Sequence, residues 1–596
     1  MIAMSEVSTQ VGGPVEVLEQ AFRNAIAAAL GDEHREVDPG IRPSQNPKFG
    51  DYQANFAMGL AKQLETDPRK LAVKVAQAAR EDLADIAEPP EVAGPGFINI
   101  RLKDEALVRM LTAMDNDSLG VVPDTDQHAV VIDLCSVNVA KQMHVGHLRS
   151  TIIGDALGRI FERLGRTVHR ENHLGDWGLP IAMVLHHLRE AGTDLDSLAL
   201  DELDAAYRAA QHDAEDDPSV MEAAKRTLVK LQQGDDELVG DWKRLIECTL
   251  KALDEALVVL NVKLGRENNR GESTYRDKLP GVVEAFRKAN LAKEDGGAIV
   301  VAFEGRKRPL LIQKSDGGYL YATTDLAAIR FRTYELNADR VIYVVDARQR
   351  DHFRDVFDAA RLIGWDETPD GITAQLDHIP FGSVLGPDKT PLKTRSGENV
   401  TLKSLLDEAC QRGADEVRRR AADPKAPTHG LTDDELAQIG RAVGIGAIKY
   451  ADLSTDLVRD YVFDMDRMIT FEGNTGPYLQ YAHARICSIF AKADVEPADV
   501  AEATISLAES AERRLALALL KYGGVVVDVA RSLEPHRLCT YLYELADTYS
   551  TFYEQCPVLK AQTEALRRSR LRLCGLVRRV LASGLDLLGI DAPLRM

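Results

Sequence analysis

The chain has 596 residues, and at about 150 residues per domain its length predicts about four domains. Apolar residues make up 45% of the chain and charged residues 28%, which excludes a disordered or collagen-like protein. Acidic residues outnumber basic ones by 93 to 73, so the net charge of −20 disfavours non-specific binding of nucleic acid over the whole surface.

The N-terminal segment predicts a compact α+β domain over residues 1–115. Residues 11–35 are expected to form a helix, because apolar side chains recur on one face and a glycine follows as a stop signal. Residues 50–85 also have a helical pattern, whereas residues 97–102 alternate like a strand. The polar residues up to position 126 predict a linker.

A strand–helix–strand unit follows the linker. Residues 128–134 and 167–172 are expected to be strands, and residues 148–164 between them an amphipathic helix. Three later apolar runs are expected to add strands to the same sheet: 298–303, 310–312 and 340–345. The charged, helical residues 185–290 lie between the halves and predict an insertion into an α/β sheet.

From about residue 430 the pattern predicts a helical bundle. The amphipathic stretches are 440–455, 475–495, 508–531, 536–555 and 561–588. Residues 560–596 carry eight basic and three acidic residues, a local charge of +5 in an acidic chain. This basic end is either a solvated helix face or a patch that binds the phosphates of a nucleic acid.

The remaining composition indicates a soluble protein with reduced thiols. The seven cysteines are odd in number and no two are spaced three apart, so we expect free cytoplasmic thiols and no thiolate zinc site. No apolar run approaches ~18 residues, so no spanning helix is expected. The first residues lack the basic and apolar regions of a signal peptide.

The loop after the first strand of the α/β unit is the strongest candidate site. The chain has neither a P-loop motif nor a glycine-rich dinucleotide fingerprint after a strand, which disfavours a P-loop NTPase and a dinucleotide-dependent dehydrogenase. Instead, His144 and His147 flank Gly146 at a predicted helix start, where free N–H groups favour phosphate. Taken alone, the two histidines also fit a metal pair or two polar loop residues.

Several segments together carry a family resemblance. His144-Val145-Gly146-His147 resembles the HIGH signature of class I aminoacyl-tRNA synthetases. Four further segments resemble arginyl-tRNA synthetases: Leu148 to Asp155, Gly175 to Gly178, Tyr321 to Ala327 and Gly589 to Met596. The resemblance runs from about residue 45 to the C-terminus, and its segments occur in the order of that family.

The resemblance implies a multidomain α/β fold. A Rossmann-type, parallel-sheet catalytic domain would occupy residues 125–400, with the helical insertion at about 185–290. An additional N-terminal domain, residues 1–115, would touch the tRNA elbow. A connecting helical segment, 400–470, would lead to an all-α anticodon-binding bundle, residues 471–596.

The same resemblance implies the reaction and its partners. L-arginine and ATP, with Mg²⁺ accompanying ATP, would give arginyl-adenylate. Arginine would then pass to the 3′-terminal adenosine of tRNA(Arg). We expect a cytoplasmic monomer without a tightly bound metal or a membrane partner.

Negative charge builds up at the α-phosphate during the reaction, so catalysis depends mostly on residues that position the phosphate and stabilise this charge. By resemblance, His144, Gly146 and His147 bind ATP, and both histidines are catalytic. Lys389 and Lys393 stand in the place of the family's KMSKS loop, whose sequence is absent here. By resemblance both bind ATP and Lys393 is also catalytic; the alternative is a basic surface loop. Lys141, just before the HIGH segment, is expected to compensate as a catalytic lysine.

The arginine side chain is a planar fork that a carboxylate can grip with two bonds. By resemblance, Tyr321, Asp325 and Gln349 grip it, with Tyr321 and Asp325 one helical turn apart. Asn138 and Asp133 resemble the residues that hold the amino end of the substrate. Family members more often have glutamate at position 133 and proline at position 137.

Two segments are expected to contact tRNA. In the N-terminal domain, Asn46 and Phe49 resemble a loop that meets the tRNA, and Phe49 either stacks on a base or packs in a small core. In the basic C-terminal stretch, the candidates for phosphate contact are Arg567, Arg568, Arg570 and Arg572.

Three alternatives stay open. The first is a class I ligase for another amino acid, or a relative that adenylates without tRNA. The second is a tRNA-binding relative that has lost catalysis. The third is a metal-binding regulator that uses His144 and His147.

Overall fold

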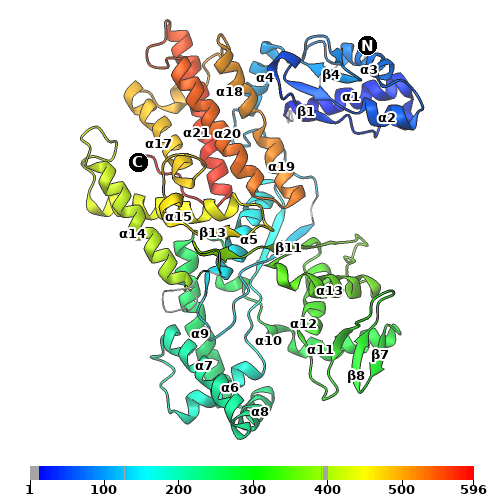
Figure 1. Cartoon of the computed structure of the whole chain (residues 1–596), viewed down its shortest axis with the longest axis vertical. Helices are drawn as coiled ribbons and strands as arrows, with labels where there is room; N and C mark the ends of the chain where they lie inside the picture. The colour runs from blue at the N-terminus through cyan, green and yellow to red at the C-terminus, as the bar shows by residue number, and fades with distance from the viewer. Residues whose placement is uncertain (1–12, 127, 391, 393–399) are drawn as a thin grey trace.

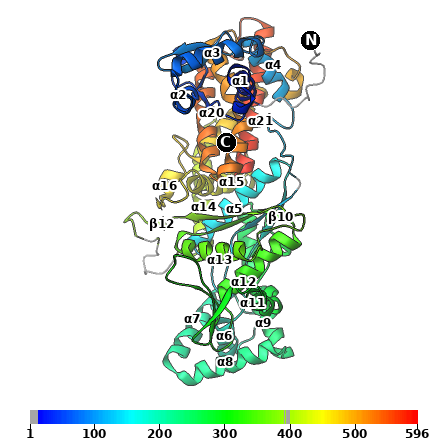
Figure 2. The ribbon, with the colours of Figure 1, turned by 90° about the vertical axis from the view of Figure 1, so that its right-hand side faces the viewer.

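The computed structural model describes residues 13–126, 128–390, 392 and 400–596, and shows an elongated molecule (Figures 1 and 2). The N-terminal domain and the C-terminal helices lie at one end, the helical insertion lies at the other, and the parallel sheet lies between them. None of the helices over the described residues is both long and apolar enough to cross a bilayer.

The N-terminal domain packs helices on a four-stranded antiparallel sheet of order β1-β2-β4-β3. Its elements are α1 (Pro14–Leu30), β1 (Ile41–Pro43), β2 (Tyr52–Ala54), α2 (Ala57–Gln63), α3 (Pro68–Asp82), β3 (Glu91–Ala93), β4 (Phe97–Ile100) and α4 (Asp104–Met114). The helix over 11–35 and the strand over 97–102 are confirmed. The helical prediction for 50–85 is wrong at its start, because β2 pairs with β4 there before the chain enters α2.

The central sheet is parallel, with strand order β11-β10-β5-β6. Its strands are β5 (Ala129–Asp133), β6 (Thr167–Glu171), β10 (Ala338–Asp346) and β11 (Gln375–Phe381). Three helices flank these strands along the chain: α5 (Val145–Arg163), α12 (Tyr321–Arg330) and α13 (Arg350–Leu362). Side chains alternate between two cores: Val130 and Ile132 enter one, and Val131 enters the other. Both faces are therefore covered, as parallel sheets require. The predicted strand–helix–strand unit is confirmed, whereas β11 was not predicted.

The predicted strands at 298–303 and 310–312 do not join this sheet. They correspond to β8 (Ala298–Val301) and β9 (Leu310–Gln313), which form a separate antiparallel sheet with β7 (Ala292–Asp295). The reason lies in the turn between β7 and β8, where Gly296 and Gly297 both have positive φ, 57° and 84°. Two such residues make a tight hairpin turn, and a hairpin can only pair its strands antiparallel.

The insertion between β6 and β7 is mostly helical, as predicted. It contains α6 (Leu179–Glu190), α7 (Leu200–Asp216), α8 (Pro218–Gln232), α9 (Asp236–Val259), α10 (Glu272–Tyr275) and α11 (Leu279–Lys288). Helices α6, α7 and α9 enclose a small core of their own, which includes Leu185, Leu203 and Leu245. Helices α6 to α9 therefore stand as a separate lobe below the sheet, whereas α10 and α11 pack beside α12 in the second core (Figure 1).

The C-terminal half is a helical bundle, and it contacts both the N-terminal domain and α5. After the short strand β12 (Val384–Leu385) come α14 (Leu402–Ala421), α15 (Asp433–Leu453), β13 (Tyr461–Val462), α16 (Met465–Met468), α17 (Gly476–Ala493), α18 (Ser510–Leu519), α19 (Tyr522–Ser532), α20 (His536–Gln555) and α21 (Glu564–Leu587). The predicted stretch 508–531 is broken into α18 and α19.

Candidate active site

The two histidines of the loop between β5 and α5 are locked by the backbone. His144 caps α5: its Nδ1 accepts the N–H of Gly146 at 3.0 Å, and the N–H of His144 donates to Nδ1 of His147 at 3.1 Å. The ring centroids lie 4.0 Å apart. Because both Nδ1 atoms accept, each neutral ring carries its proton on Nε2 and presents a donor.

Charge and burial keep these rings neutral. Burial lowers the pKa of His147 to about 3, with the neighbouring His144 adding to the effect. Burial and the charges of Arg348 and Lys141 lower the pKa of His144. Two N–H donors therefore stand at the N-terminus of a 19-residue helix, a place that favours phosphate.

The loop between β5 and α5 has a strained backbone, and Gly146 lies very close to the His144 ring. Three non-glycine residues, Cys135, Ser136 and Ala140, have positive φ of 72°, 52° and 66°. Such conformations cost of order 1–3 kcal/mol each and gather at functional sites. A Cβ on Gly146 would lie 2.8 Å from Cε1 of His144, so a larger residue would displace that ring.

The lysines predicted for phosphate binding lie in different surroundings. Lys141 is close enough to lower the pKa of both histidines, and its Nζ lies 4.2 Å from the ring centroid of Tyr207 in α7. Lys389 is exposed in a turn after β12, with φ of 61°. Lys393 lies outside the described residues.

Tyr321 and Asp325 lie one turn apart on α12, as predicted. Tyr321 is the first residue of the helix and is 71% exposed. The Asp325 side chain is only 14% exposed, and its Oδ2 lies 2.6 Å from Nε2 of His352 in α13. Burial lowers the pKa of His352, but the hydrogen bond to Asp325 and the negative charge of that carboxylate outweigh burial, so the pKa lies above its usual value.

Glu272 is a site residue that sequence reasoning missed. Burial first, and then the nearby charges of Asp176 and Asp325, raise its pKa to about 8, and its charge also raises the pKa of Tyr321. Nothing in the sequence distinguishes Glu272 from the other acids of the charged insertion. Carboxyl groups that raise one another's pKa form a place where a bound cation would be stabilised.

The residues predicted for the amino end of the substrate lie at the carboxyl end of β5. Asp133 is 4% exposed; its Oδ1 accepts the Ser136 hydroxyl at 2.8 Å and its Oδ2 accepts Nη2 of Arg332 at 2.7 Å. Asn138 is exposed and forms an isolated β-bridge with Gly175. A Cβ on Gly175 would lie 2.2 Å from Oδ1 of Asn138. Gln349 is exposed at the N-cap of α13.

Arg348, which precedes Gln349, was also not predicted. Its guanidinium pairs with both oxygens of Asp346 at 2.9 Å, and 88% of its side chain is exposed. Its charge lowers the pKa of His144, so a cation from the turn after β10 lies near that histidine.

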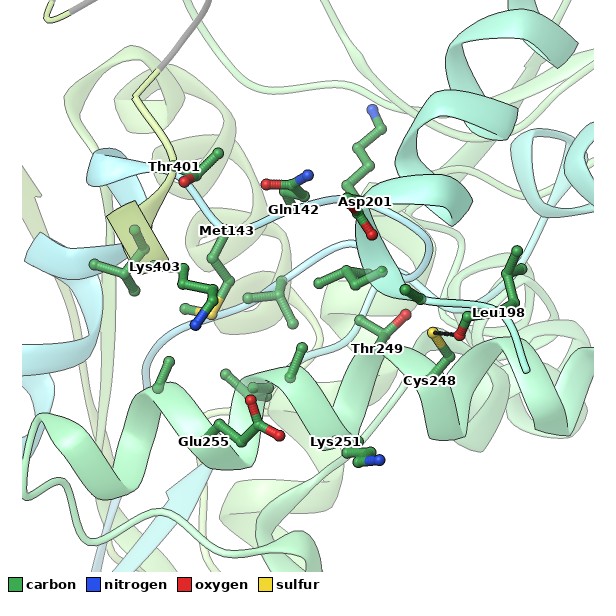
Figure 3. Close-up of a pocket in the computed structure, with 18 of the residues that line it drawn as sticks. Gln142, Met143, Leu198, Asp201, Cys248, Thr249, Lys251, Glu255, Thr401 and Lys403 are labelled. Atoms are coloured by element: carbon green, nitrogen blue, oxygen red, sulfur yellow. Dashed lines mark hydrogen bonds between the residues drawn. The ribbon is translucent and has the colours of Figure 1, made fainter. Parts of the chain in front are cut away.

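A cavity of about 840 Å³ lies on the insertion side of this loop (Figure 3). Gln142, Met143 and Thr401 line it together with Lys251 and Glu255 from α9. Of the predicted site residues that the structure describes, only Lys141 lines it, so this cavity is distinct from the cluster around Asp325.

The predicted tRNA-contact residues divide into two groups. Phe49 is 47% exposed, so packing in a small core is excluded, and the Asn46 side chain accepts the N–H of Lys48 at 3.0 Å. Arg567 and Arg568 remain partly exposed.

Arg570 and Arg572 are buried, at 5% and 9% exposed. Arg570 pairs with Glu512 at 2.7 Å, and Arg572 pairs with Asp115 at 2.8 Å. This burial contradicts the predicted role in phosphate binding, because their charges are compensated inside the protein.

Over the described residues, one group of three side chains lies close enough to share a cation: Asp126, His128 and Asp339. It precedes β5 and begins β10, so it lies at the amino edge of the sheet, opposite the loop of His144. The two histidines predicted as a metal pair in one alternative are not part of it.

Comparison with known proteins accounts for this arrangement. Residues 109–465 match the family described as tRNA synthetases class I (R), catalytic domain. The chain belongs to the arginine branch of the class I tRNA synthetases. In this synthetase, residues 16–102 match the arginyl tRNA synthetase N-terminal domain and residues 479–596 the DALR anticodon-binding domain.

Relatives cover the synthetase from end to end. It is 45% identical to the arginine–tRNA ligase of Thermobifida fusca over 98% of this chain and 100% of that one, and 43% identical to that of a Synechococcus strain with the same coverage. The arginyl-tRNA synthetase structure from Plasmodium falciparum superposes with a TM-score of 0.84 at 29% identity, covering 98% of this chain and 100% of that one. The Thermus thermophilus structure gives 0.80 at 28% identity, covering 97% and 100%. The predicted family and fold class are therefore confirmed.

Proposed function

We propose that this synthetase is an arginine–tRNA ligase: it activates L-arginine with ATP and transfers it to the 3′-terminal adenosine of tRNA(Arg). The observation that carries the proposal is the joint position of two sets of groups. Donors for phosphate stand at the N-terminus of α5, and acidic groups for a guanidinium stand at Glu272 and Asp325. Ligands of parallel α/β folds bind at the carboxyl ends of the strands, where both sets lie.

On the phosphate side, the carboxylate of arginine attacks the α-phosphate and pyrophosphate leaves. Nε2–H of His144 and of His147 donate to phosphate oxygens as their charge rises, with Gly146 allowing close approach. Lys141, Lys389 and Lys393 supply positive charge for the pyrophosphate. Mg²⁺ would arrive with ATP and be held chiefly by its phosphates.

On the amino-acid side, Asp325 and Glu272 grip the guanidinium, Tyr321 covers it, and Gln349 contributes an amide. His352 holds one oxygen of Asp325 and so orients the carboxylate. Asp133 and Asn138 hold the α-ammonium group. Lysine carries the same charge as arginine but only a point donor, so it would leave part of this acidic cluster unpaired.

For tRNA, the proposal assigns the elbow to residues 1–115, through Asn46 and Phe49, and the anticodon to residues 471–596. The catalytic domain is 125–400, and 400–470 connects the two. Arg567 and Arg568 remain candidates for phosphate contact. A monomer in the cytoplasm is proposed, in keeping with seven free cysteines.

The test is an aminoacylation assay with each of the twenty amino acids and total tRNA. Arginine alone should be charged. Asp325→Asn keeps the size of the side chain but removes its charge, so the KM for arginine should rise by about 10² or more while the KM for ATP barely changes. A change in the arginine KM of less than about threefold, roughly 0.7 kcal/mol, would remove Asp325 from the guanidinium site.

A further inference from the structure

A fully buried arginine lies just beyond the helix that carries Tyr321 and Asp325. Arg332 belongs to the π-helix Phe331–Glu335 (η5), which directly follows α12, and its side chain is 0% exposed. Arginine is almost never buried completely unless it is paired, so its partners show what this residue holds.

The Arg332 guanidinium joins the ends of two neighbouring strands. Its Nη2 donates to Oδ2 of Asp133, the last residue of β5, at 2.7 Å. Its Nε donates to Oε2 of Glu171, the last residue of β6, also at 2.7 Å. Both bonds are charge-assisted and shielded from water, which makes them strong and geometrically demanding.

The other oxygens of the two carboxylates are held as well. The Ser136 hydroxyl donates to Oδ1 of Asp133 at 2.8 Å, and Nε of Arg270 donates to Oε1 of Glu171 at 3.0 Å. The Arg332 guanidinium also lies 4.8 Å from the ring centroid of Tyr343 in β10. Three strands of the sheet thus meet at this one side chain.

The π-helix explains how the chain reaches this point. A π turn contains one more residue than an α turn, so the side chains that follow are rotated relative to the faces of α12. In this turn Arg332 faces the interior, whereas Tyr334 is 59% exposed. π turns are frequent at functional sites because of such local re-orientation.

We propose that Arg332 is a positioning residue that fixes the distance between the two ends of the arginine site. It hydrogen-bonds Asp133, at the amino end of the substrate, and it directly follows the helix that carries Asp325, at the guanidinium end. The inference rests on the proposed function. An amino acid of the right length meets both ends at once. A looser tie would weaken arginine binding and, in particular, the discrimination between side chains that differ by one methylene.

The test compares arginine with homoarginine, whose side chain is one methylene longer. Arg332→Lys keeps the positive charge, but a single ammonium group cannot reproduce the fork between two carboxylates. The KM for arginine should rise about tenfold or more, and the preference for arginine over homoarginine should fall at least about threefold. The KM for ATP should stay within about twofold of the wild-type value.

Arg159→Lys is the matched control. Arg159 lies near the C-terminal end of α5, and its side chain is only 3% exposed. It also pairs with two carboxylates, Asp155 at 2.8 Å and Asp586 at 3.1 Å. It should lose thermal stability as Arg332→Lys does, yet keep the wild-type preference for arginine.

Glu171→Gln supplies a second variant if Arg332→Lys does not fold, since it keeps the shape of one partner and removes its charge. It should shift the preference in the same direction, by a smaller factor. Wild-type preference in the folded variants, accompanied only by lower stability, would overturn the proposal and leave Arg332 a structural residue. A wild-type protein that does not charge tRNA with arginine would instead overturn the proposed function.

Discussion

At the scale of single residues, the site is built from groups whose charge state is set by their neighbours. The phosphate side carries neutral histidines, because burial lowers the pKa of His147 to about 3. The amino-acid side carries acids held close together, and the pKa of Glu272 is raised to about 8. The phosphate side therefore offers N–H donors at a helix N-terminus, and the amino-acid side offers carboxyl groups that a bound guanidinium would stabilise in their charged form.

Arginine binding should release a proton. In the free protein Glu272 is mostly protonated at pH 7, because burial and two nearby carboxylates disfavour its charge. A bound guanidinium reverses that preference, so the affinity for arginine should rise with pH up to about 8 and then level off. Calorimetry at pH 7 in buffers of different ionisation enthalpy should show net proton release on arginine binding, and this release should fall as pH rises above about 8.

Glu272→Gln is the control for this prediction. Its arginine affinity should be low, and it should lose the rise with pH that Glu272 causes, leaving only the pH dependence that His352 contributes through Asp325. The folded-state pKa of Glu272 lies above its unfolded value of 4.5, so its contribution to stability is present below pH 4.5 and is lost as pH rises through about 8. The ligand-free variant should therefore be more stable than wild type at pH 8, and equal pH profiles for the two proteins would contradict the assignment.

At the scale of elements, glycines let α14 and α15 cross at backbone contact. A Cβ on Gly444 would lie 2.0 Å from the carbonyl oxygen of Ala409, and one on Gly413 would lie 2.1 Å from that of Gly440. Backbone atoms cannot move aside as a flexible side chain can. The crossing therefore depends on these positions, although glycine is a poor helix former.

Gly444→Ala should force the two helices apart. Overpacking of this kind costs about 1–3 kcal/mol, and thermal melting should show a lower midpoint. Gly240→Ala in α9 is the matched control, because its Cβ would meet nothing nearer than Arg244 Nη1 at 3.9 Å. That variant should be more stable by about 0.5–1 kcal/mol, since alanine favours a helix. An unchanged midpoint for Gly444→Ala would mean that the crossing relaxes freely.

At the scale of the whole molecule, ion pairs join the N-terminal domain and its linker to the C-terminal bundle. Arg513 in α18 pairs with Asp51 at 2.7 Å and Asp104 at 2.8 Å, and Arg572 and Arg579 in α21 pair with Asp115 at 2.8 and 2.9 Å. A Cβ on Gly523 would lie 1.9 Å from the carbonyl oxygen of Gly120, so the backbones also touch. Two domains proposed to bind distant parts of one tRNA are thereby held at a defined spacing (Figure 2).

Arg513→Met should loosen this spacing. Asp51 is 7% exposed at its side chain, and an unpaired buried carboxylate costs about 3–5 kcal/mol locally. We expect kcat/KM for tRNA to fall about tenfold while the KM values for arginine and ATP stay unchanged, with a larger radius of gyration in X-ray scattering. Arg35→Met removes the same charge from an ion pair within the N-terminal domain and should change neither; an unchanged radius for Arg513→Met would argue against the coupling.

The amino-acid sequence by itself determined what depends on local order along the chain: the helical period, the strand–helix–strand unit, and the motif of His144 and His147 at a helix start. The position of Tyr321 and Asp325 on one face of a helix also followed from sequence, because one helical turn separates them. Glu272, His352 and Arg332 did not, since each reaches the site from a different element and no local pattern distinguishes it. The burial of Arg570 and Arg572, and the separate sheet of β7 to β9, were likewise decided by tertiary contacts. A basic run looks the same in sequence whether its side chains face solvent or a buried carboxylate, and only the packed structure supplies that partner.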